Sequence, residues 1–310
     1  MVTVLFQSDT DDPAPWRAAL ARAVPDIDFR VWPEAGPREE IDYALVWKPP
    51  SGMLKSLHRL KAILSLGAGV DHIFKDPDLP HGVPITRMVD AGLAVQMSEY
   101  ALYGVLHFHR HMDRYAEQQR GGEWRQLCAV PPQARSVGVM GLGVLGADFA
   151  RKAAALGFRV LGWSRSAKHI PGVEAFDGDQ GFERFLGRTE VLVNFLPLTP
   201  QTRGILDAGT FARLPQGAFL INIARGEHLV EADLLAALDR GALGGAMLDV
   251  FSAEPLPVDH PFWRHPRILI TPHIAGQAIA DLMVEQVVDN IRRIERGQAP
   301  LGLVQPDQGY

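Results

Sequence analysis

The stretch SVGVMGLGVLG, residues Ser136 to Gly146, decides the fold of this chain. Its first part, Ser136 to Met140, predicts a buried parallel strand, and an alanine-rich helix is expected to follow the glycines as far as Leu156. The G-x-G-x-x-G spacing allows a tight turn, a close approach by a pyrophosphate and close packing of helix on strand. N–H groups at the helix start would then face the phosphates. We therefore expect a dinucleotide to contact Gly141, Gly143, Val144, Leu145 and Gly146.

Short apolar runs continue this pattern on both sides of the glycine turn. Before it lie Val2 to Phe6, Asp28 to Trp32, Tyr43 to Trp47 and Ala62 to Leu66, and after it lie Phe158 to Trp163, Glu190 to Phe195, Ala218 to Ile223, Gly245 to Val250 and Ile268 to Thr271. Helical patterns separate most of these runs, which is typical of parallel sheets with crossover helices. Long helices are predicted over Gln96 to Gly121 and Ala278 to Arg296. The fold class is α/β, with two doubly wound domains because 310 residues exceed what one core usually holds.

The composition excludes several classes of protein. The chain is 47% hydrophobic and 22% charged with a net charge of −5, which indicates a globular protein without the basic stripe that nucleic acid requires. No run reaches the length of a membrane span, and the N-terminus lacks the basic start of a secretory signal. Cys128 is the one cysteine, so an internal disulfide is impossible and the cytoplasm is the expected location.

The end of the second strand after the glycine turn predicts the type of dinucleotide. An acidic residue there would hold the ribose 2′-hydroxyl of NAD, but the run ends in Ser164, Arg165 and Ser166. An arginine can form a charge-assisted fork with a 2′-phosphate, and serine hydroxyls can donate to it. NADP, with NADPH as its reduced form, is therefore favoured over NAD. NAD stays possible, because a solvated loop arginine would also explain Arg165.

Three later strands each carry a reactive side chain just beyond their C-terminal end, and these residues are Arg225, Glu254 and His273. In a parallel sheet such ends lie on one edge, which also carries the glycine turn, so we expect the three to converge beside the nicotinamide. Each residue alone has a simpler interpretation: a surface ion pair, a loop glutamate, or a hydrogen-bonded histidine. Their shared position makes a catalytic site the better hypothesis.

These side chains suit the reduction of a small 2-oxo acid. Histidine can donate a proton to the carbonyl oxygen as hydride arrives at the carbon, which fits His273. A carboxylate beside the imidazole stabilises the imidazolium and fixes its orientation, which fits Glu254. A guanidinium can bind the substrate carboxylate and polarise the carbonyl, which fits Arg225.

Other histidines give no second site. His107 and His111 would share a helix face at i, i+4, but no third ligand is spaced nearby, so we predict no metal and interpret them as interface packing residues. His228 and His265 are interpreted as surface loop residues.

Motifs along nearly the whole chain carry a family resemblance. They are DYALVWKPP at 42–50, LGAGVD at 66–71, QMSEYA at 96–101, GLGVLG at 141–146, WSRS at 163–166, NFLPLTPQT at 194–202, INIARG at 221–226, LLAALDRGALGGAMLDVFSAEPLP at 234–257 and ITPHIAG at 270–276. With them the chain resembles the D-isomer-specific 2-hydroxyacid dehydrogenase family, and within it the bacterial glyoxylate/hydroxypyruvate reductase A group. QMSEY stands where the wider family has a V-A-E pattern, which leaves the size of the substrate open.

The resemblance implies further site residues. Arg225, Glu254 and His273 would be the catalytic trio, in agreement with the reasoning from the strands. The backbone of Gly67, Ala68 and Gly69 would bind the substrate carboxylate, with Trp47 lining the pocket. The remaining cofactor contacts would be Val70, Met97, Leu196, Pro197, Thr202, Ile223, Ala224, Asp249, His273 and Ala275.

The resemblance also implies the domain organisation. A Rossmann-type nucleotide domain, residues 99–283, would be inserted into a flavodoxin-like substrate domain formed by residues 1–98 and 284–310. The helix that includes Gln96 would be the element through which two chains associate as a homodimer.

Residues and resemblance together predict an NADPH-dependent reductase of small 2-oxo acids, which converts glyoxylate to glycolate and hydroxypyruvate to D-glycerate. Two alternatives stay open. One is an NAD-dependent dehydrogenase of another D-2-hydroxy acid such as phosphoglycerate, which cofactor titration would reveal. The other is a dinucleotide-sensing binding protein, although the sequence shows none of the extra interaction segments that such proteins usually carry.

Overall fold

The structure, a computed structural model, describes residues 2–89 and 92–305. The chain divides into two compact units: unit 1 consists of Met1–Leu93 and Gln277–Tyr310, and unit 2 of Ala94–Gly276. Both divisions lie near the start of a helix, α3 (Leu93–His109) and α9 (Ala280–Glu295). The boundaries that the resemblance predicts, after residues 98 and 283, lie inside these helices.

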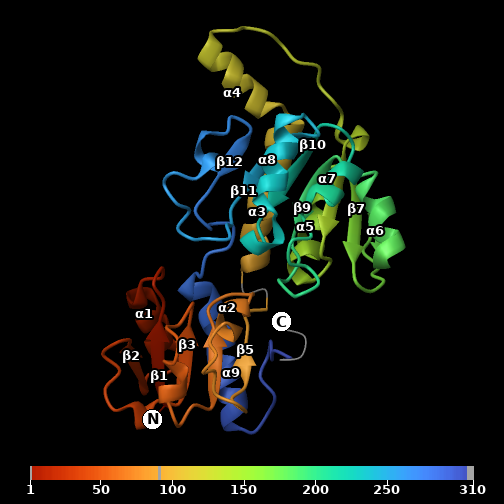
Figure 1. The fold of residues 1–310 in the computed structure, drawn as a ribbon. Helices are drawn as coiled ribbons and strands as arrows, with labels where there is room; N and C mark the ends of the chain where they lie inside the picture. The colour runs from red at the N-terminus through yellow and green to blue at the C-terminus, as the bar shows by residue number, and fades with distance from the viewer. Residues whose placement is uncertain (1, 90–91, 306–310) are drawn as a thin grey trace. The chain divides into compact units, whose positions relative to one another are not determined.

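Unit 1 contains a parallel sheet with the strand order β2-β1-β3-β4-β5 (Figure 1). Its strands are β1 (Val2–Gln7), β2 (Ile27–Val31), β3 (Tyr43–Val46), β4 (Ala62–Ser65) and β5 (Ile85–Thr86). Helices α1 (Pro13–Ala23) and α9 pack against each other, and a short α2 (Asp71–Phe74) follows β4. This order is that of flavodoxin-like sheets, so the predicted fold class of this part is confirmed.

Unit 2 contains a second parallel sheet with the order β12-β11-β10-β9-β6-β7-β8. Its strands are β6 (Ser136–Met140), β7 (Arg159–Ser164), β8 (Val173–Asp177), β9 (Val191–Asn194), β10 (Ala218–Asn222), β11 (Leu243–Leu248) and β12 (Ile268–Ile270). Its helices are α3, α4 (Met112–Gly121), α5 (Val144–Ala155), α6 (Gly178–Leu186), α7 (Ala208–Arg213) and α8 (Glu231–Asp239). Read from β8 inward, the sheet has the Rossmann order with one strand added, which confirms the predicted nucleotide-binding fold.

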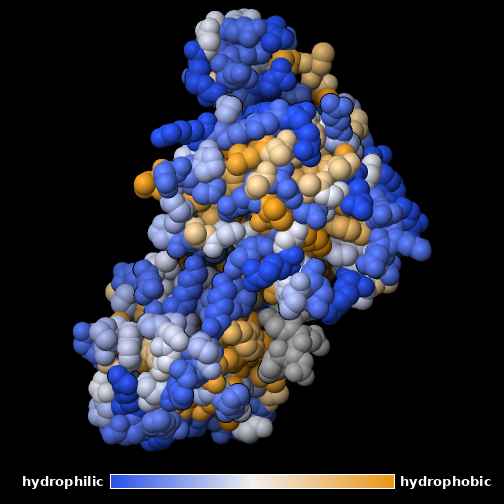
Figure 2. All heavy atoms as spheres, in the orientation of Figure 1, coloured by the Kyte–Doolittle hydropathy of each residue, from blue (hydrophilic) through white to orange (hydrophobic). Residues whose placement is uncertain are grey.

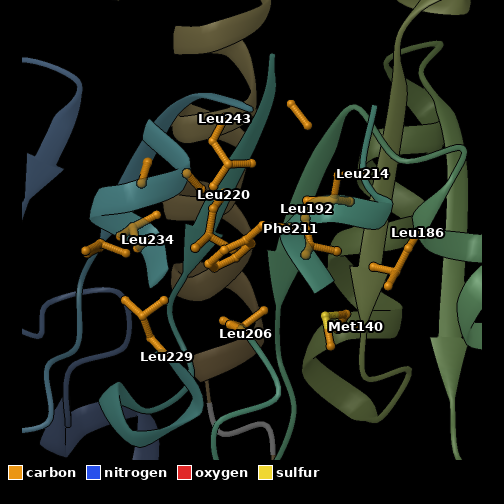
Figure 3. Packing of buried hydrophobic residues seen from close by; sticks show 14 of the residues in the cluster. Met140, Leu186, Leu192, Leu206, Phe211, Leu214, Leu220, Leu229, Leu234 and Leu243 are labelled. Atoms are coloured by element: carbon orange, nitrogen blue, oxygen red, sulfur yellow. The ribbon is translucent and has the colours of Figure 1, made fainter. Parts of the chain in front are cut away.

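Two apolar layers hold the sheet of unit 2, one on each face. Neighbouring strand residues alternate between them: Leu192 and Leu220 belong to one layer, Val193 and Ile221 to the other. Figure 3 shows the first layer, where Phe211 from α7 and Leu234 from α8 lie beside the leucines of β9 and β10. Because helices cover both faces, these strands read as continuous apolar runs in the sequence.

The predicted single helix over Gln96 to Gly121 is wrong, because the structure has two helices there. His111 has φ +57, a left-handed conformation that ends α3 and precedes α4. His107 and His111 therefore do not share a helix face. Figure 1 shows α4 and the segment after it lying away from the sheet of unit 2.

Two strands were missed for physical reasons. β5 is only two residues long, and β8 is an edge strand in which only Phe176 is buried.

The surface drawn in Figure 2 is mostly polar, with apolar residues in small groups. In residues 2–89 and 92–305, none of the helices has the length and apolar character of a membrane span.

Candidate active site

The glycine turn joins β6 to α5 at the carboxyl edge of the unit 2 sheet. Gly141 has φ +98, and a Cβ on Gly146 would lie 1.9 Å from the carbonyl oxygen of Gly141, so both positions require glycine. A Cβ on Gly143 would meet nothing within 4 Å. Gly143 is the N-cap of the 12-residue α5 and has no side chain with which to cap its first N–H groups. The turn therefore offers an open cradle and helix N–H groups that fit a pyrophosphate.

The next strand, β7, ends in the residues predicted to select NADP. The Ser164 hydroxyl donates to the carbonyl oxygen of Ser166 at 2.8 Å and closes a turn that exposes Arg165 and Ser166. Ser164 is itself buried. In this structure Ser164 shapes the turn, and Arg165 is an exposed cation at the end of β7, which neighbours the strand that leads into the glycine turn.

Arg225, Glu254 and His273 follow β10, β11 and β12, which are neighbours in the sheet. The loops after β10 and β11 touch closely, since a Cβ on Gly226 would lie 1.9 Å from the backbone carbon of Phe251. Only glycine fits beside Arg225 unless the Glu254 loop moves. The parallel topology brings all three strand ends to the edge that carries the glycine turn.

The imidazole of His273 contacts the carboxylate of Glu254, with 2.9 Å between Nδ1 and Oε2. Because an ionised carboxylate only accepts hydrogen bonds, Nδ1 carries the hydrogen in this pair. The other carboxylate oxygen accepts from the N–H of Phe251 at 3.1 Å, which fixes Glu254 to its own loop. The side chains of His273 and Glu254 are 28% and 20% exposed, so the pair is partly shielded yet reachable.

A buried carboxylate, Asp249, holds the loop that carries His273. Its Oδ1 accepts from the Thr271 hydroxyl at 2.6 Å and from the Ile274 N–H at 2.8 Å, and its Oδ2 accepts from the Ala275 N–H at 2.8 Å. Burial raises the pKa of Asp249, although these donors stabilise its carboxylate. His273 has φ +56, which L residues rarely adopt, so the surrounding bonds hold a strained residue at the site.

The structure places three polar side chains beneath this edge that the sequence analysis missed as a group: Asn194, Asn222 and His228, each 0% exposed. The interpretation of His228 as a surface residue is wrong, because its ring nitrogens contact Asn194 and the carbonyl oxygen of Pro197 inside unit 2. Burial lowers the pKa of His228 to about 4. The sequence carried a signal, since the apolar runs VLVN and AFLIN both end in asparagine.

The site residues predicted in unit 1 follow β3 and β4. The ring of Trp47 covers Gly67 so closely that a Cβ there would lie 2.5 Å from Cζ3 of the indole. The imidazole of His72 packs against the indole of Trp47, with 4.3 Å between ring centroids. The N–H of Gly67 donates to Ser65 Oγ at 3.2 Å, while Ala68 and Gly69 are half-buried.

The remaining residues predicted to border the cofactor differ in exposure. Val70 in unit 1 and Leu196, Ile223, Ala224 and Ala275 in unit 2 are buried, whereas Pro197 is exposed and Met97 and Thr202 are half-buried. The Thr202 hydroxyl donates to the carbonyl oxygen of Pro197 at 2.7 Å and so shapes the loop after β9.

Comparison with known proteins shows the family to which the chain belongs. The model of the family described as "D-isomer specific 2-hydroxyacid dehydrogenase, NAD binding domain" matches residues 102–275. The chain belongs to the D-isomer specific 2-hydroxyacid dehydrogenase family, as its motifs predicted.

Individual relatives match the full chain. A glyoxylate/hydroxypyruvate reductase A of Serratia proteamaculans (strain 568) is 46% identical over 314 residues, which cover 100% of both chains. The D-isomer specific 2-hydroxyacid dehydrogenase of Xanthobacter autotrophicus Py2, solved with NADPH and MES, is 42% identical with a TM-score of 0.95, covering 100% of this chain and 99% of the other. An NADPH-dependent glyoxylate/hydroxypyruvate reductase of Sinorhizobium meliloti, solved with NADP and sulfate, is 41% identical with a TM-score of 0.94 and full coverage of both chains.

Proposed function

We propose that this protein is an NADPH-dependent reductase of small 2-oxo acids, which reduces glyoxylate to glycolate and hydroxypyruvate to D-glycerate. The observation that carries the proposal is the contact of 2.9 Å between His273 and Glu254 at the sheet edge that also bears the glycine turn and Arg225. The full-length similarity to a glyoxylate/hydroxypyruvate reductase A supports the choice of substrates.

The proposed cofactor is NADPH, which would supply a hydride to the carbonyl carbon of the substrate. The cradle at Gly143 and the N–H groups of α5 would hold its pyrophosphate, and Arg165 would pair with its 2′-phosphate. The two solved relatives described above hold NADPH and NADP, which supports the same choice here.

The chain's own residues would supply the proton and the orientation. Glu254 keeps the ring in place through Nδ1, and in the imidazolium form His273 would donate the proton on Nε2 to the carbonyl oxygen and become the neutral imidazole. Arg225 would bind the substrate carboxylate and hold the carbonyl in line for hydride transfer. By the family pattern, Trp47 and the backbone of residues 67–69 would contribute to substrate binding. One hydride to carbon and one proton to oxygen give the hydroxy acid and NADP⁺.

The test is NADPH oxidation measured over a panel of glyoxylate, hydroxypyruvate, pyruvate and phosphohydroxypyruvate. We expect His273→Ala and Arg225→Ala to lower kcat by about 100-fold or more while NADPH still binds, since a positioned proton donor contributes about 10² to 10⁴ in rate. His265→Ala, before β12 at the opposite edge of the sheet, serves as the control and should keep wild-type turnover. Unchanged rates in the two site variants, or a preference for NADH with phosphohydroxypyruvate, would overturn the proposal.

We also propose that the protein is a cytoplasmic homodimer formed through α3, α4 and the segment that follows them. Supporting this, Tyr103 and Met112 are exposed and Trp124 is 100% exposed, an unusual state for a tryptophan. Light scattering should give about twice the chain mass of 34.1 kDa for the wild type, and a smaller mass for Met112→Ser with Trp124→Ser. A wild-type monomer would contradict the dimer, and recovery of the protein in a membrane or periplasmic fraction would contradict the location.

A further inference from the structure

The buried side chains of Asn194, Asn222 and His228 form one hydrogen-bonded network. Asn194 Nδ2 donates to Asn222 Oδ1 at 3.1 Å and lies 3.1 Å from His228 Nδ1. The side-chain amide nitrogen of asparagine donates hydrogen bonds and does not accept them, so His228 Nδ1 is the acceptor. His228 Nε2 then carries the ring hydrogen and donates to the Pro197 carbonyl oxygen at 3.2 Å. The imidazole is therefore neutral, in agreement with a pKa that burial lowers to about 4.

The network ends on the backbone of Arg225. Asn222 Nδ2 donates to the carbonyl oxygen of Arg225 at 3.0 Å, and the backbone N–H of His228 donates to the same oxygen at 3.3 Å. Asn222 Oδ1 also accepts from the N–H of Ala224 at 3.4 Å. One buried asparagine thus binds both the carbonyl oxygen of Arg225 and the N–H of Ala224, the residue before it.

The same network reaches the loop after β9, where the family resemblance predicts cofactor contacts. Asn194 Oδ1 accepts from the N–H of Leu196 at 3.1 Å, and His228 binds the carbonyl oxygen of Pro197. The backbone N–H of Leu206 donates to the carbonyl oxygen of His228 at 2.9 Å, which ties the two loops a second time.

We infer that Asn194, Asn222 and His228 are positioning residues that set the backbone of Arg225, and with it the direction of its guanidinium, relative to the loop at Pro197. This inference rests on the proposed role of Arg225 in binding the substrate carboxylate. Because the three side chains are fully buried, they act through Arg225 and do not touch the substrate. A network in which every member is paired holds one geometry, since any shift leaves a buried polar group without its bond.

The expected effect is a loss of turnover without a loss of cofactor binding. A displacement of about 1 Å at a substrate-positioning group can cost about 100-fold in rate, so we expect His228→Gln to lower kcat/KM for glyoxylate by about 10- to 100-fold. Glutamine can still donate to Pro197 but offers no acceptor where imidazole has Nδ1, so this variant removes the link to Asn194. The Kd for NADPH, measured by its fluorescence, should stay within about twofold, because the glycine turn and Arg165 are untouched.

The decisive experiment measures His228→Gln in the wild-type and in the Arg225→Ala background. If His228 acts through Arg225, the substitution should change kcat/KM by less than about twofold once the guanidinium is gone. His265→Gln makes the same exchange of imidazole for amide at a partly exposed position and should leave both backgrounds unchanged. Should His228→Gln fail to fold by circular dichroism, Asn222→Ser, which removes the amide that binds the Arg225 carbonyl, is measured in the same two backgrounds.

The outcomes separate this inference from the proposed function. A large loss in the wild-type background that vanishes in Arg225→Ala supports the positioning role. Wild-type kinetics in the folded variant, or an equal loss in both backgrounds, overturns it while the proposed function stands. If the wild type does not oxidise NADPH with any oxo acid, or if Arg225→Ala keeps full activity, the proposed function fails first and the inference falls with it.

Discussion

His228 makes the stability of unit 2 depend on pH in a direction that follows from its burial. Its side chain is fully buried, and burial lowers its pKa from 6.5 to about 4. As the pH falls, the unfolded chain binds a proton on this residue before the folded chain does. The stabilisation that the neutral ring provides is therefore complete above pH 6.5 and is lost as the pH falls from 6.5 to 4.

The size of the effect follows from the difference between the two pKa values. One pKa unit corresponds to about 1.4 kcal/mol. The lowering of the His228 pKa from 6.5 to about 4 therefore costs the folded protein about 3 kcal/mol of unfolding free energy once the pH is below 4. Integration of the same two titration curves gives about 2 kcal/mol by pH 5.

The assay compares urea unfolding of the wild type and His228→Gln at about pH 7 and about pH 5. Glutamine does not titrate, and the other ionisable groups are common to both proteins, so the stability advantage of the wild type should shrink by about 2 kcal/mol between these conditions. Long-range ¹H–¹⁵N spectra of the histidine rings give the pKa directly. A ring that titrates near its ordinary value, or an advantage that is the same at both pH values, would refute the reasoning.

Further predictions concern the other parts of the site. Gly146→Ala should lower the unfolding free energy by about 1 to 3 kcal/mol because its Cβ would overlap the Gly141 carbonyl, whereas Gly143→Ala should melt normally and only weaken NADPH binding; equal melting temperatures would contradict this. Arg165→Ala should raise KM for NADPH by about tenfold or more and leave KM for NADH nearly unchanged, since a charge-assisted bond contributes about 1.5 to 3 kcal/mol; an equal change for both cofactors would argue against a 2′-phosphate site. Asp249→Asn should lower the unfolding free energy by about 1 to 3 kcal/mol in urea and reduce kcat, because one N–H of the His273 loop loses its acceptor; wild-type values would exclude the role of Asp249 in holding that loop.

The strands of unit 2 and the residues that follow them were predictable because both depend on a parallel sheet that is buried on its two faces. Helices cover both faces of the unit 2 sheet, so β6, β9 and β10 appear as uninterrupted apolar runs. The residues that follow such runs, among them Arg225 and His273, must lie at the carboxyl edge of a parallel sheet. Position along the chain was enough to group them, although their side-chain contacts were not visible in the sequence.

Features that depend on tertiary contacts were not predictable in this way. The break at His111 interrupts a segment that is helical in its periodicity on both sides, so no local residue type marks it. β8 pairs with β7 by backbone bonds while most of its side chains stay in solvent. A histidine in a loop between two apolar runs is exposed in many proteins, and only the hydrogen-bond partners of His228 explain why burial is tolerated here.

The polar residues at the ends of the central strands explain how this edge stays ordered. Side chains at the strand ends bind backbone groups in the loops after β9, β10 and β12, which would otherwise lack partners inside the fold. Asn194 and Asn222 lie between donors and acceptors, and an amide offers both kinds of group. Asp249 is surrounded only by donors from the His273 loop, where a carboxylate with two accepting oxygens is the better partner. The choice of asparagine or aspartate at each strand end thus follows from the hydrogen-bonding groups that the next loop presents, and exchanging them should disturb the loops of Arg225 and His273 separately.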